Sequence, residues 1–210
     1  MEIEILLKLL HKEYTNPKTE LDNWMTTPQF IASVILSAQA TDKQVNKISK
    51  NLFEKYSSVD DFANADINEM EKLVSSINYY KTKATRIIDA NKYIKESLNG
   101  EIPKSIDELI KIPGIGRKSA NVILQETMGI SQGIVVDTHV TRVSNRLKLV
   151  ENQTNAEKIE KELMSRIPQN EWRFFSQSIV LHGRYVCKAK KPNCKECILN
   201  KICPSAFTPE

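Results

Sequence analysis

The fold is decided by the stretch Ile112-Pro113-Gly114-Ile115-Gly116-Arg117-Lys118-Ser119-Ala120-Asn121. Two glycines interrupt a helical pattern, and a basic pair opens the helix that follows. Glycine adopts backbone angles that other residues resist, and it lets another molecule approach the main chain closely. The unpaired N–H groups at a helix start suit a phosphate. These residues alone leave two interpretations open: a hairpin that grips a nucleic-acid backbone, or an ordinary turn between two helices.

Helical periodicity extends outward from this hairpin over nearly the whole chain. A short helix from Ser105 to Lys111 and a second from Arg117 to about Met128 are expected to flank the turn. Residues 133–136 are apolar and could form a strand, but the segment is short and the sequence offers no second strand-like segment to pair with it. We therefore interpret these residues as a buried connector. The pattern therefore predicts an all-α protein built from many short helices.

Several helix starts can be placed from their capping signals. Thr27-Pro28 predicts an apolar helix with Thr27 as its N-cap, and Thr41 followed by Gln44 has the form of a capping box. The remaining expected elements are an N-terminal helix with the apolar stripe Ile3, Leu6, Leu7 and Leu10, helices starting at Asp66 and Thr154, a helix marked by Ile87, Ile88 and Tyr93 that ends at Asn99-Gly100, and a last helix from about Trp172 to Tyr185.

Composition favours a globular protein that stays out of membranes. The chain has 210 residues, 40% of them hydrophobic and 27% charged, with a net charge of +4. No stretch is long and apolar enough to span a bilayer, and the N-terminus carries acidic residues where a secretory signal needs basic ones. We therefore expect a cytoplasmic protein with no targeting segment. The modest positive charge permits a nucleic-acid partner without requiring one.

The four cysteines of the chain form one cluster near the C-terminus, with the pattern C-x6-C-x2-C-x5-C. In a reducing compartment such a cluster favours a metal site over disulfides. Four thiolates suit either a structural zinc or a [4Fe–4S] cluster, and the absence of paired C-x2-C knuckles disfavours zinc without excluding it. The candidate ligands are Cys187, Cys194, Cys197 and Cys203. The loop between the first two holds Lys188, Lys190 and Lys191, which are either phosphate contacts or solvated charges.

Asp137 stands in an otherwise apolar run that continues to Val140. Burial of a carboxylate needs a reason. One is structural, as the N-cap of the next helix, and the other is catalytic, as a carboxylate that stabilises positive charge. The cap is the interpretation that the sequence favours, and His139 is expected to be structural.

Five motifs occur in one order along the chain: residues 36–42 (LSAQATD), the hairpin 112–121, residues 136–139 (VDTH), residues 182–185 (HGRY) and the cysteine pattern. Together they closely resemble the endonuclease III family, the helix-hairpin-helix DNA glycosylases that carry an iron–sulfur cluster. The resemblance covers nearly the whole chain. The cysteine spacing, combined with Lys118 and Asp137, is its most specific part.

The resemblance implies two lobes with a DNA-binding cleft between them. One is a six-helix domain over residues 21–132 that carries the helix-hairpin-helix at about 105–128. The other is a cluster domain made of residues 1–20 and 133–210, with a [4Fe–4S] cluster and not zinc in the loop 187–203. The implied activity is that of a monomeric, nucleoid-associated, bifunctional DNA glycosylase and AP lyase. It would excise oxidised pyrimidines from double-stranded DNA and cut 3′ to the abasic site by β-elimination.

The resemblance also implies roles for individual residues. Lys118 matches the nucleophile that forms a Schiff base, and Asp137 the essential carboxylate. Gln39 resembles the residue that fills the space left by the extruded base. Tyr79 lies in the loop that resembles the wedge on the opposite strand, although this chain has Asn78-Tyr79-Tyr80 where the family usually has glycine and then Leu or Phe before a tyrosine. The expected backbone contacts are Gly114, Gly116, Lys188, Lys190 and Lys191.

Two alternatives remain open at this stage. One is a related glycosylase that removes mismatched or deaminated bases. The other is a non-catalytic DNA-binding module with a structural metal, against which the pairing of Lys118 with Asp137 argues.

Overall fold

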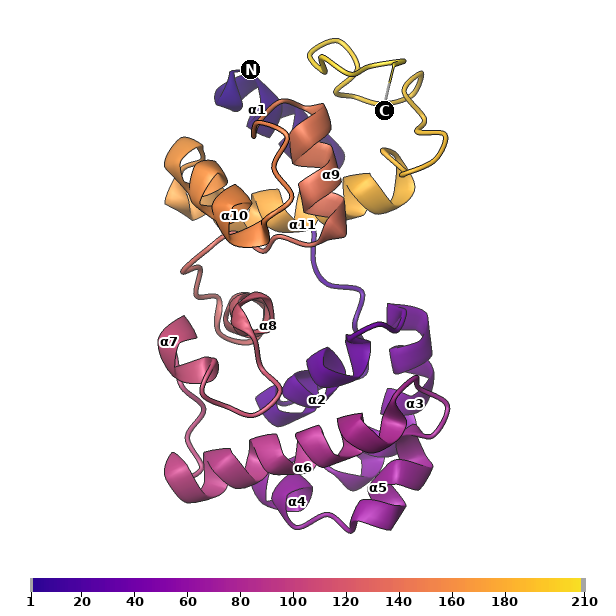
Figure 1. Cartoon of the computed structure of the whole chain (residues 1–210), viewed down its shortest axis with the longest axis vertical. Helices are drawn as coiled ribbons and strands as arrows, with labels where there is room; N and C mark the ends of the chain where they lie inside the picture. The colour runs from indigo at the N-terminus through magenta and orange to yellow at the C-terminus, as the bar shows by residue number, and fades with distance from the viewer. Residues whose placement is uncertain (1, 209–210) are drawn as a thin grey trace. The chain divides into compact units, whose positions relative to one another are not determined.

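The computed structural model describes residues 2–208, and all regular structure in that range is helical (Figure 1). This confirms the all-α prediction, including a connector without strand structure at residues 133–136. The chain divides into two compact units. One runs from Thr19 to Gln132, and the other combines the residues up to Lys18 with those from Gly133 onward. Within residues 2–208, no helix has the length and apolar character needed to cross a membrane.

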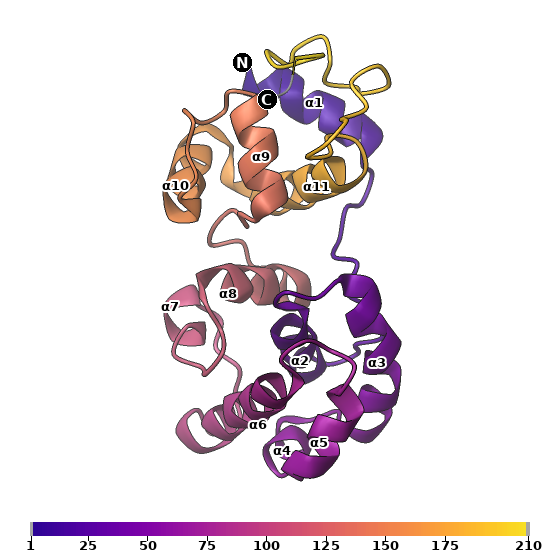
Figure 2. The ribbon, with the colours of Figure 1, turned by 45° about the vertical axis from the view of Figure 1, so that its right-hand side comes forward.

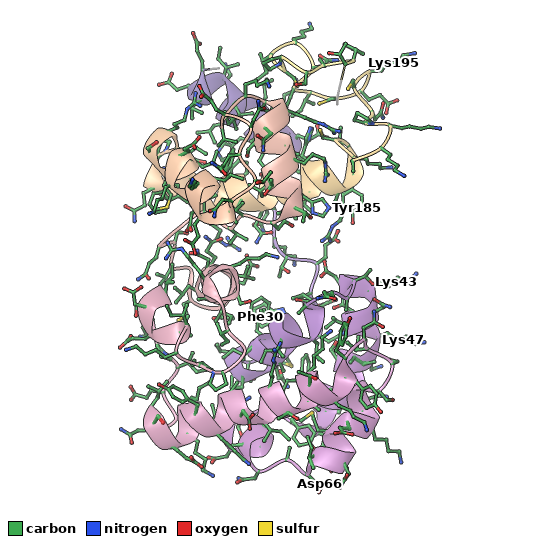
Figure 3. All side chains as sticks on the ribbon, viewed as in Figure 1. Phe30, Lys43, Lys47, Asp66, Tyr185 and Lys195 are labelled. Carbon is green, nitrogen blue, oxygen red and sulfur yellow. The ribbon has the colours of Figure 1, made fainter. Side chains whose placement is uncertain are left out.

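The unit Thr19–Gln132 is built around the apolar helix α2. Its side chains from Pro28 to Leu36 are all buried, because the helix is apolar on nearly every face. Figure 2 shows α2 surrounded by α3, α6 and α8, and Phe30 points into this core (Figure 3). The elements are α2 (Thr27–Ser37), α3 (Asp42–Lys55), α4 (Val59–Ala63), α5 (Ile67–Val74), α6 (Tyr80–Ser97), α7 (Ile106–Leu109), α8 (Arg117–Ile123) and the π-helical η1 (Leu124–Met128).

Side-chain caps set the starts of α2, α3, α4, α5, α9 and α10. Two of these starts differ by one residue from the prediction. The N-cap of α2 is Thr26 and not Thr27, because only Thr26 forms a capping box with Gln29, three residues along. In the same way, Asn155 caps α10 in place of Thr154. The predicted caps of α3 and α5 are confirmed. The short helix α4 was not predicted, although its Ser58–Asp61 capping box is present.

The second unit packs the N-terminal helix against the C-terminal third of the chain. Leu6 and Leu10 of α1 are fully buried, and α1 and α9 both contact α11. Gly183 makes the approach of α9 to α11 possible, since a Cβ there would lie 2.8 Å from the Cβ of His139. The elements are α1 (Ile3–Glu13), α9 (Thr138–Arg146), α10 (Ala156–Arg166), the 3₁₀ helix η2 (Gln169–Glu171) and α11 (Trp172–Tyr185).

Candidate nucleic-acid interface and cysteine pocket

The hairpin forms between α7 and α8, in the unit Thr19–Gln132. The side chains of Ile112 and Ile115 are buried and anchor the turn to the core. The Ile115 N–H donates a hydrogen bond to the Ile112 carbonyl at 3.1 Å. Gly114 has φ +83°, a conformation that a side chain would strain, and a Cβ there would touch Arg86 of α6. The apolar anchors and this glycine therefore fix the turn. The first helix ends at Leu109, earlier than the predicted Lys111.

The start of α8 presents its backbone to solvent. Gly116 is the N-cap and offers no side chain to the first turn, and a Cβ at this position would meet nothing within 4 Å. Gly116, Arg117 and Lys118 are all exposed. A phosphate can therefore approach the main chain here, with the Lys118 amine in the first turn.

Asp137, in the other unit, is the N-cap of α9. Its Oδ1 accepts hydrogen bonds from the backbone N–H groups of His139 and Val140, both at 2.8 Å. Its Oδ2 lies 3.0 Å from His139 Nδ1, and the side chain is 16% exposed. The structural interpretation of Asp137 is confirmed. The cap occupies Oδ1 and so fixes the direction in which Oδ2 points.

Gln39 and Tyr79 both lie in exposed turns with left-handed backbone conformation. Gln39, just after α2, has φ +53°, and Tyr79, the N-cap of α6, has φ +59°. The tyrosine is 68% exposed. Non-glycine residues seldom adopt this conformation, and where they do the surroundings hold them there. The backbone in both turns is therefore set by neighbouring structure.

All four cysteines line a single pocket, and none forms a disulfide. Burial raises the pKa of Cys197 to about 11 against the opposing effect of a hydrogen bond from the Leu199 backbone, with smaller contributions from the other cysteines, and burial also raises the pKa of Cys203. Such crowded, buried thiols become thiolates readily only when a bound metal offsets their charge. The donor set therefore fits a four-thiolate metal group. Among residues 2–208, no three His, Cys, Asp or Glu side chains are grouped closely enough to hold a single metal ion.

Two neighbours of the sulfur atoms were missed from the sequence. Arg146 Nη1 donates to Cys187 Sγ at 3.4 Å, and His182 Nε2 lies 3.4 Å from Cys197 Sγ. The other ring nitrogen of His182 is 3.0 Å from the Tyr14 hydroxyl, and burial lowers the histidine pKa to about 4. Hydrogen bonds of this kind orient metal ligands and tune the bound group. The one sequence signal that could have pointed to the contact between His182 and Cys197 is the place of His182 in the HGRY motif.

The basic loop next to Cys187 is anchored by its main chain. Arg146 donates to the carbonyl of Lys188 at 2.8 Å and to that of Ala189 at 3.1 Å. The side chains of Lys188, Lys190 and Lys191 are exposed. A loop with a fixed backbone and free ammonium groups is suited to phosphate contacts.

Comparison with known proteins agrees with this arrangement. Residues 32–169 match the model of the HhH-GPD superfamily base excision DNA repair protein. Endonuclease III of Synechocystis sp. is 44% identical over 203 residues, which cover 97% of this chain and 91% of that protein. Endonuclease III of Escherichia coli is 35% identical, covering 96% of this chain and 93% of the relative.

Two solved structures agree over nearly the same span. The structure of a non-covalent endonuclease III–DNA complex matches with a TM-score of 0.90 and 38% identity, covering 97% of this chain and 94% of that one. That of a trapped endonuclease III–DNA covalent intermediate matches with a TM-score of 0.89, also at 38% identity, covering 97% and 95%. This chain belongs to the endonuclease III family, within the HhH-GPD superfamily of base excision DNA repair proteins.

Proposed function

We propose that the chain is a bifunctional DNA glycosylase and AP lyase that excises oxidised pyrimidines from double-stranded DNA and then cuts the strand 3′ to the abasic site. The observation that carries the proposal is the exposed Lys118 in the first turn of α8, behind a glycine cap that leaves room for a phosphate. Membership in the endonuclease III family supports the same reaction class. We expect a monomer that works at the nucleoid, where its substrate lies.

The amine of Lys118 accounts for both steps of the reaction. Its lone pair attacks C1′ of the sugar, and the bond from C1′ to the base breaks, with the electron pair leaving on the base. Loss of a proton from nitrogen and opening of the sugar ring give a Schiff base between Lys118 and C1′. The Schiff base acidifies the C2′ proton, and its removal expels the 3′ phosphate by β-elimination. A glycosylase without this amine would have to activate water and would stop at the abasic site.

We assign Asp137 to the electrostatic stabilisation of the sugar. Positive charge develops on the sugar as the base leaves, and a fixed carboxylate oxygen stabilises it. The cap geometry supports this role, because α9 holds Oδ1 with two N–H groups and leaves Oδ2 beside the His139 ring. The carboxylate is therefore oriented before the substrate binds.

The remaining proposed contacts hold the DNA and extrude the base. A damaged base must leave the stack before its sugar can be attacked. We assign Gln39 to the space that the base vacates and Tyr79 to stacking on the opposite strand, since both are exposed on turns held by their surroundings. Phosphate contacts are assigned to the hairpin glycines Gly114 and Gly116 and to the basic loop of Lys188, Lys190 and Lys191.

A [4Fe–4S] cluster is the proposed occupant of the cysteine pocket, with Cys187, Cys194, Cys197 and Cys203 as ligands. Bound there, the cluster would supply four metal–thiolate bonds that crosslink the loop 187–203. Arg146 supports the same loop, since it donates hydrogen bonds to the sulfur of Cys187 and to the carbonyl of Lys188.

A panel of lesion-bearing duplexes tests the proposal. The purified protein is incubated with duplexes that contain thymine glycol, a preformed abasic site, a G·T mismatch, uracil or no lesion. Base release and strand scission are followed separately. We expect excision and scission at thymine glycol and scission at the abasic site. Excision confined to the mismatch or to uracil would favour the related glycosylase, and binding without any chemistry would favour a DNA-binding module.

A further inference from the structure

We propose that Lys83, on α6, is a positioning residue that holds the Gln39 turn and the Tyr79 turn in the geometry needed to extrude a base. The inference rests on the proposed function and adds to it a residue that no motif of the sequence indicates. It concerns the unit Thr19–Gln132 alone.

The environment of Lys83 is unusual for a lysine. The residue is 3% exposed, and its Nζ donates a hydrogen bond to the Leu36 carbonyl at 2.9 Å. Within residues 2–208 its ammonium has no carboxylate partner, and burial lowers its pKa. Burial of a charge that lacks an opposite charge is unfavourable, so its retention calls for a specific role.

The Lys83–Leu36 hydrogen bond acts at the point where α2 ends. In a continued helix, the Ala40 N–H would donate to the Leu36 carbonyl, four residues back. Here the Ala40 N–H donates to the Ser37 carbonyl at 3.1 Å, and the ammonium takes the Leu36 carbonyl. The helix stops at Ser37, and the chain turns through Gln39 with φ +53°. Lys83 thus stabilises the end of α2 that presents Gln39.

The main chain of Lys83 belongs to the second turn. Its N–H donates to the Tyr79 carbonyl at 3.0 Å and closes the first turn of α6, directly after the left-handed residue. One residue therefore bonds to the last turn of α2 through its side chain and to Tyr79 through its backbone. This link sets the spacing of the two turns that are proposed to enter the duplex.

A purely stabilising role is the alternative, since a cation at a helix C-terminus also favours the helix dipole. The two roles separate when one substrate needs extrusion and the other does not. A thymine glycol in a duplex must be extruded, whereas a preformed abasic site in a single-stranded oligonucleotide has no base to extrude. A stabilising role lowers both activities in proportion to the folded fraction. A positioning role lowers the first alone.

The experiment compares Lys83→Met with Lys92→Met, which removes an exposed lysine from the same helix. Single-turnover rates on both substrates are divided by the folded fraction from circular dichroism. We expect Lys83→Met to lose about 10²-fold on the duplex, because small misplacements of contacting groups have effects of this size. Its rate on the single strand should stay within about threefold of the unmutated rate, as should both rates of the control.

Coupling to Gln39 gives a second readout. If Lys83 acts through this turn, Lys83→Met should add little to the loss already caused by Gln39→Ala, so the two effects should be clearly non-additive. Should Lys83→Met fail to fold, Lys83→Gln, which is neutral but keeps an N–H donor, is measured in the same assays, and an intermediate loss confined to the duplex is expected.

Three results would overturn the inference: equal loss on both substrates, no loss on the duplex, or additivity with Gln39→Ala. An unmutated protein that is inactive on both substrates would instead remove the proposed function itself. The two failures are therefore distinguishable.

Discussion

Asp137 caps α9 and is proposed to stabilise the positive charge on the sugar, and substitution by asparagine or by alanine should separate these two roles. Asparagine keeps a carbonyl oxygen at the position of Oδ1, where the N–H groups of His139 and Val140 donate at 2.8 Å. Its amide replaces the charged Oδ2 beside the His139 ring. Alanine removes both oxygens. The Asn variant therefore keeps the cap and loses the charge, whereas the Ala variant loses both.

The structure sets the expected sizes. Loss of an N-cap side chain destabilises by about 1 to 2 kcal/mol, which for a chain of this length lowers Tm by about 2 to 8 °C. Asparagine caps helices about as well as aspartate, so Asp137→Asn should change the free energy of unfolding by less than about 1 kcal/mol. Removal of one preorganised electrostatic contact to the transition state should slow excision by about 10²- to 10³-fold in both variants.

Three measurements check this prediction: thermal unfolding, binding of a duplex with a non-cleavable abasic analogue by fluorescence anisotropy, and single-turnover excision of thymine glycol. We expect Asp137→Asn to melt and bind like the unmutated protein while its chemistry fails. The reasoning is refuted if Asp137→Asn excises thymine glycol at the unmutated rate, or if its activity falls only as far as its folded fraction.

Three further predictions concern the hairpin, the cysteines and a capping carboxylate. Gly114→Ala should destabilise by about 1 kcal/mol because its φ is +83°. Gly116→Ala should lose only the preference of an N-cap for glycine over alanine and should weaken DNA binding at equal folded fraction; unchanged DNA binding in Gly116→Ala would contradict this. Iron and sulfide analysis should find a [4Fe–4S] cluster that is lost with any one cysteine, and a colourless, zinc-loaded, fully active protein would exclude it. The backbone N–H groups of Ser57 and Ser58 lower the pKa of Asp61 from 3.8 to about 2, so its contribution to stability is present above pH 3.8 and lost as the pH falls toward 2. The difference in stability between the unmutated protein and Asp61→Ala should shrink over that range in acid unfolding titrations, and a constant difference would argue against the cap.

Local signals in the sequence predicted much of the helical framework. Thr41 and Asp66 were placed correctly because a cap and its partner lie within one turn. The start of α2 differs from the prediction because Thr26 and Thr27 are both acceptable caps, and only Thr26 has a glutamine, Gln29, three residues along to complete a capping box. Asp137 was expected to be a cap, and it is.

Contacts between residues far apart in the sequence could not be predicted from such local signals. Nothing in the sequence distinguishes Lys83 from the exposed lysines of α6, since its burial depends on the end of α2. Arg146 and His182 reach their cysteines across 41 and 15 residues of sequence. The roles of Lys118, Gln39 and Tyr79 stay predictions, because their chemistry appears only when DNA is bound.

The covalent role of Lys118 is the central claim, and mapping of the trapped adduct tests it most directly. The protein is incubated with abasic duplex DNA and borohydride, which reduces a Schiff base to a stable amine, and the modified peptide is identified by mass spectrometry. Lys118→Gln is run beside Lys111→Gln, which removes an exposed lysine directly before the hairpin. We predict an adduct on Lys118 that is absent in Lys118→Gln and retained in Lys111→Gln. An adduct on any other residue, or trapping that survives Lys118→Gln, would contradict the account.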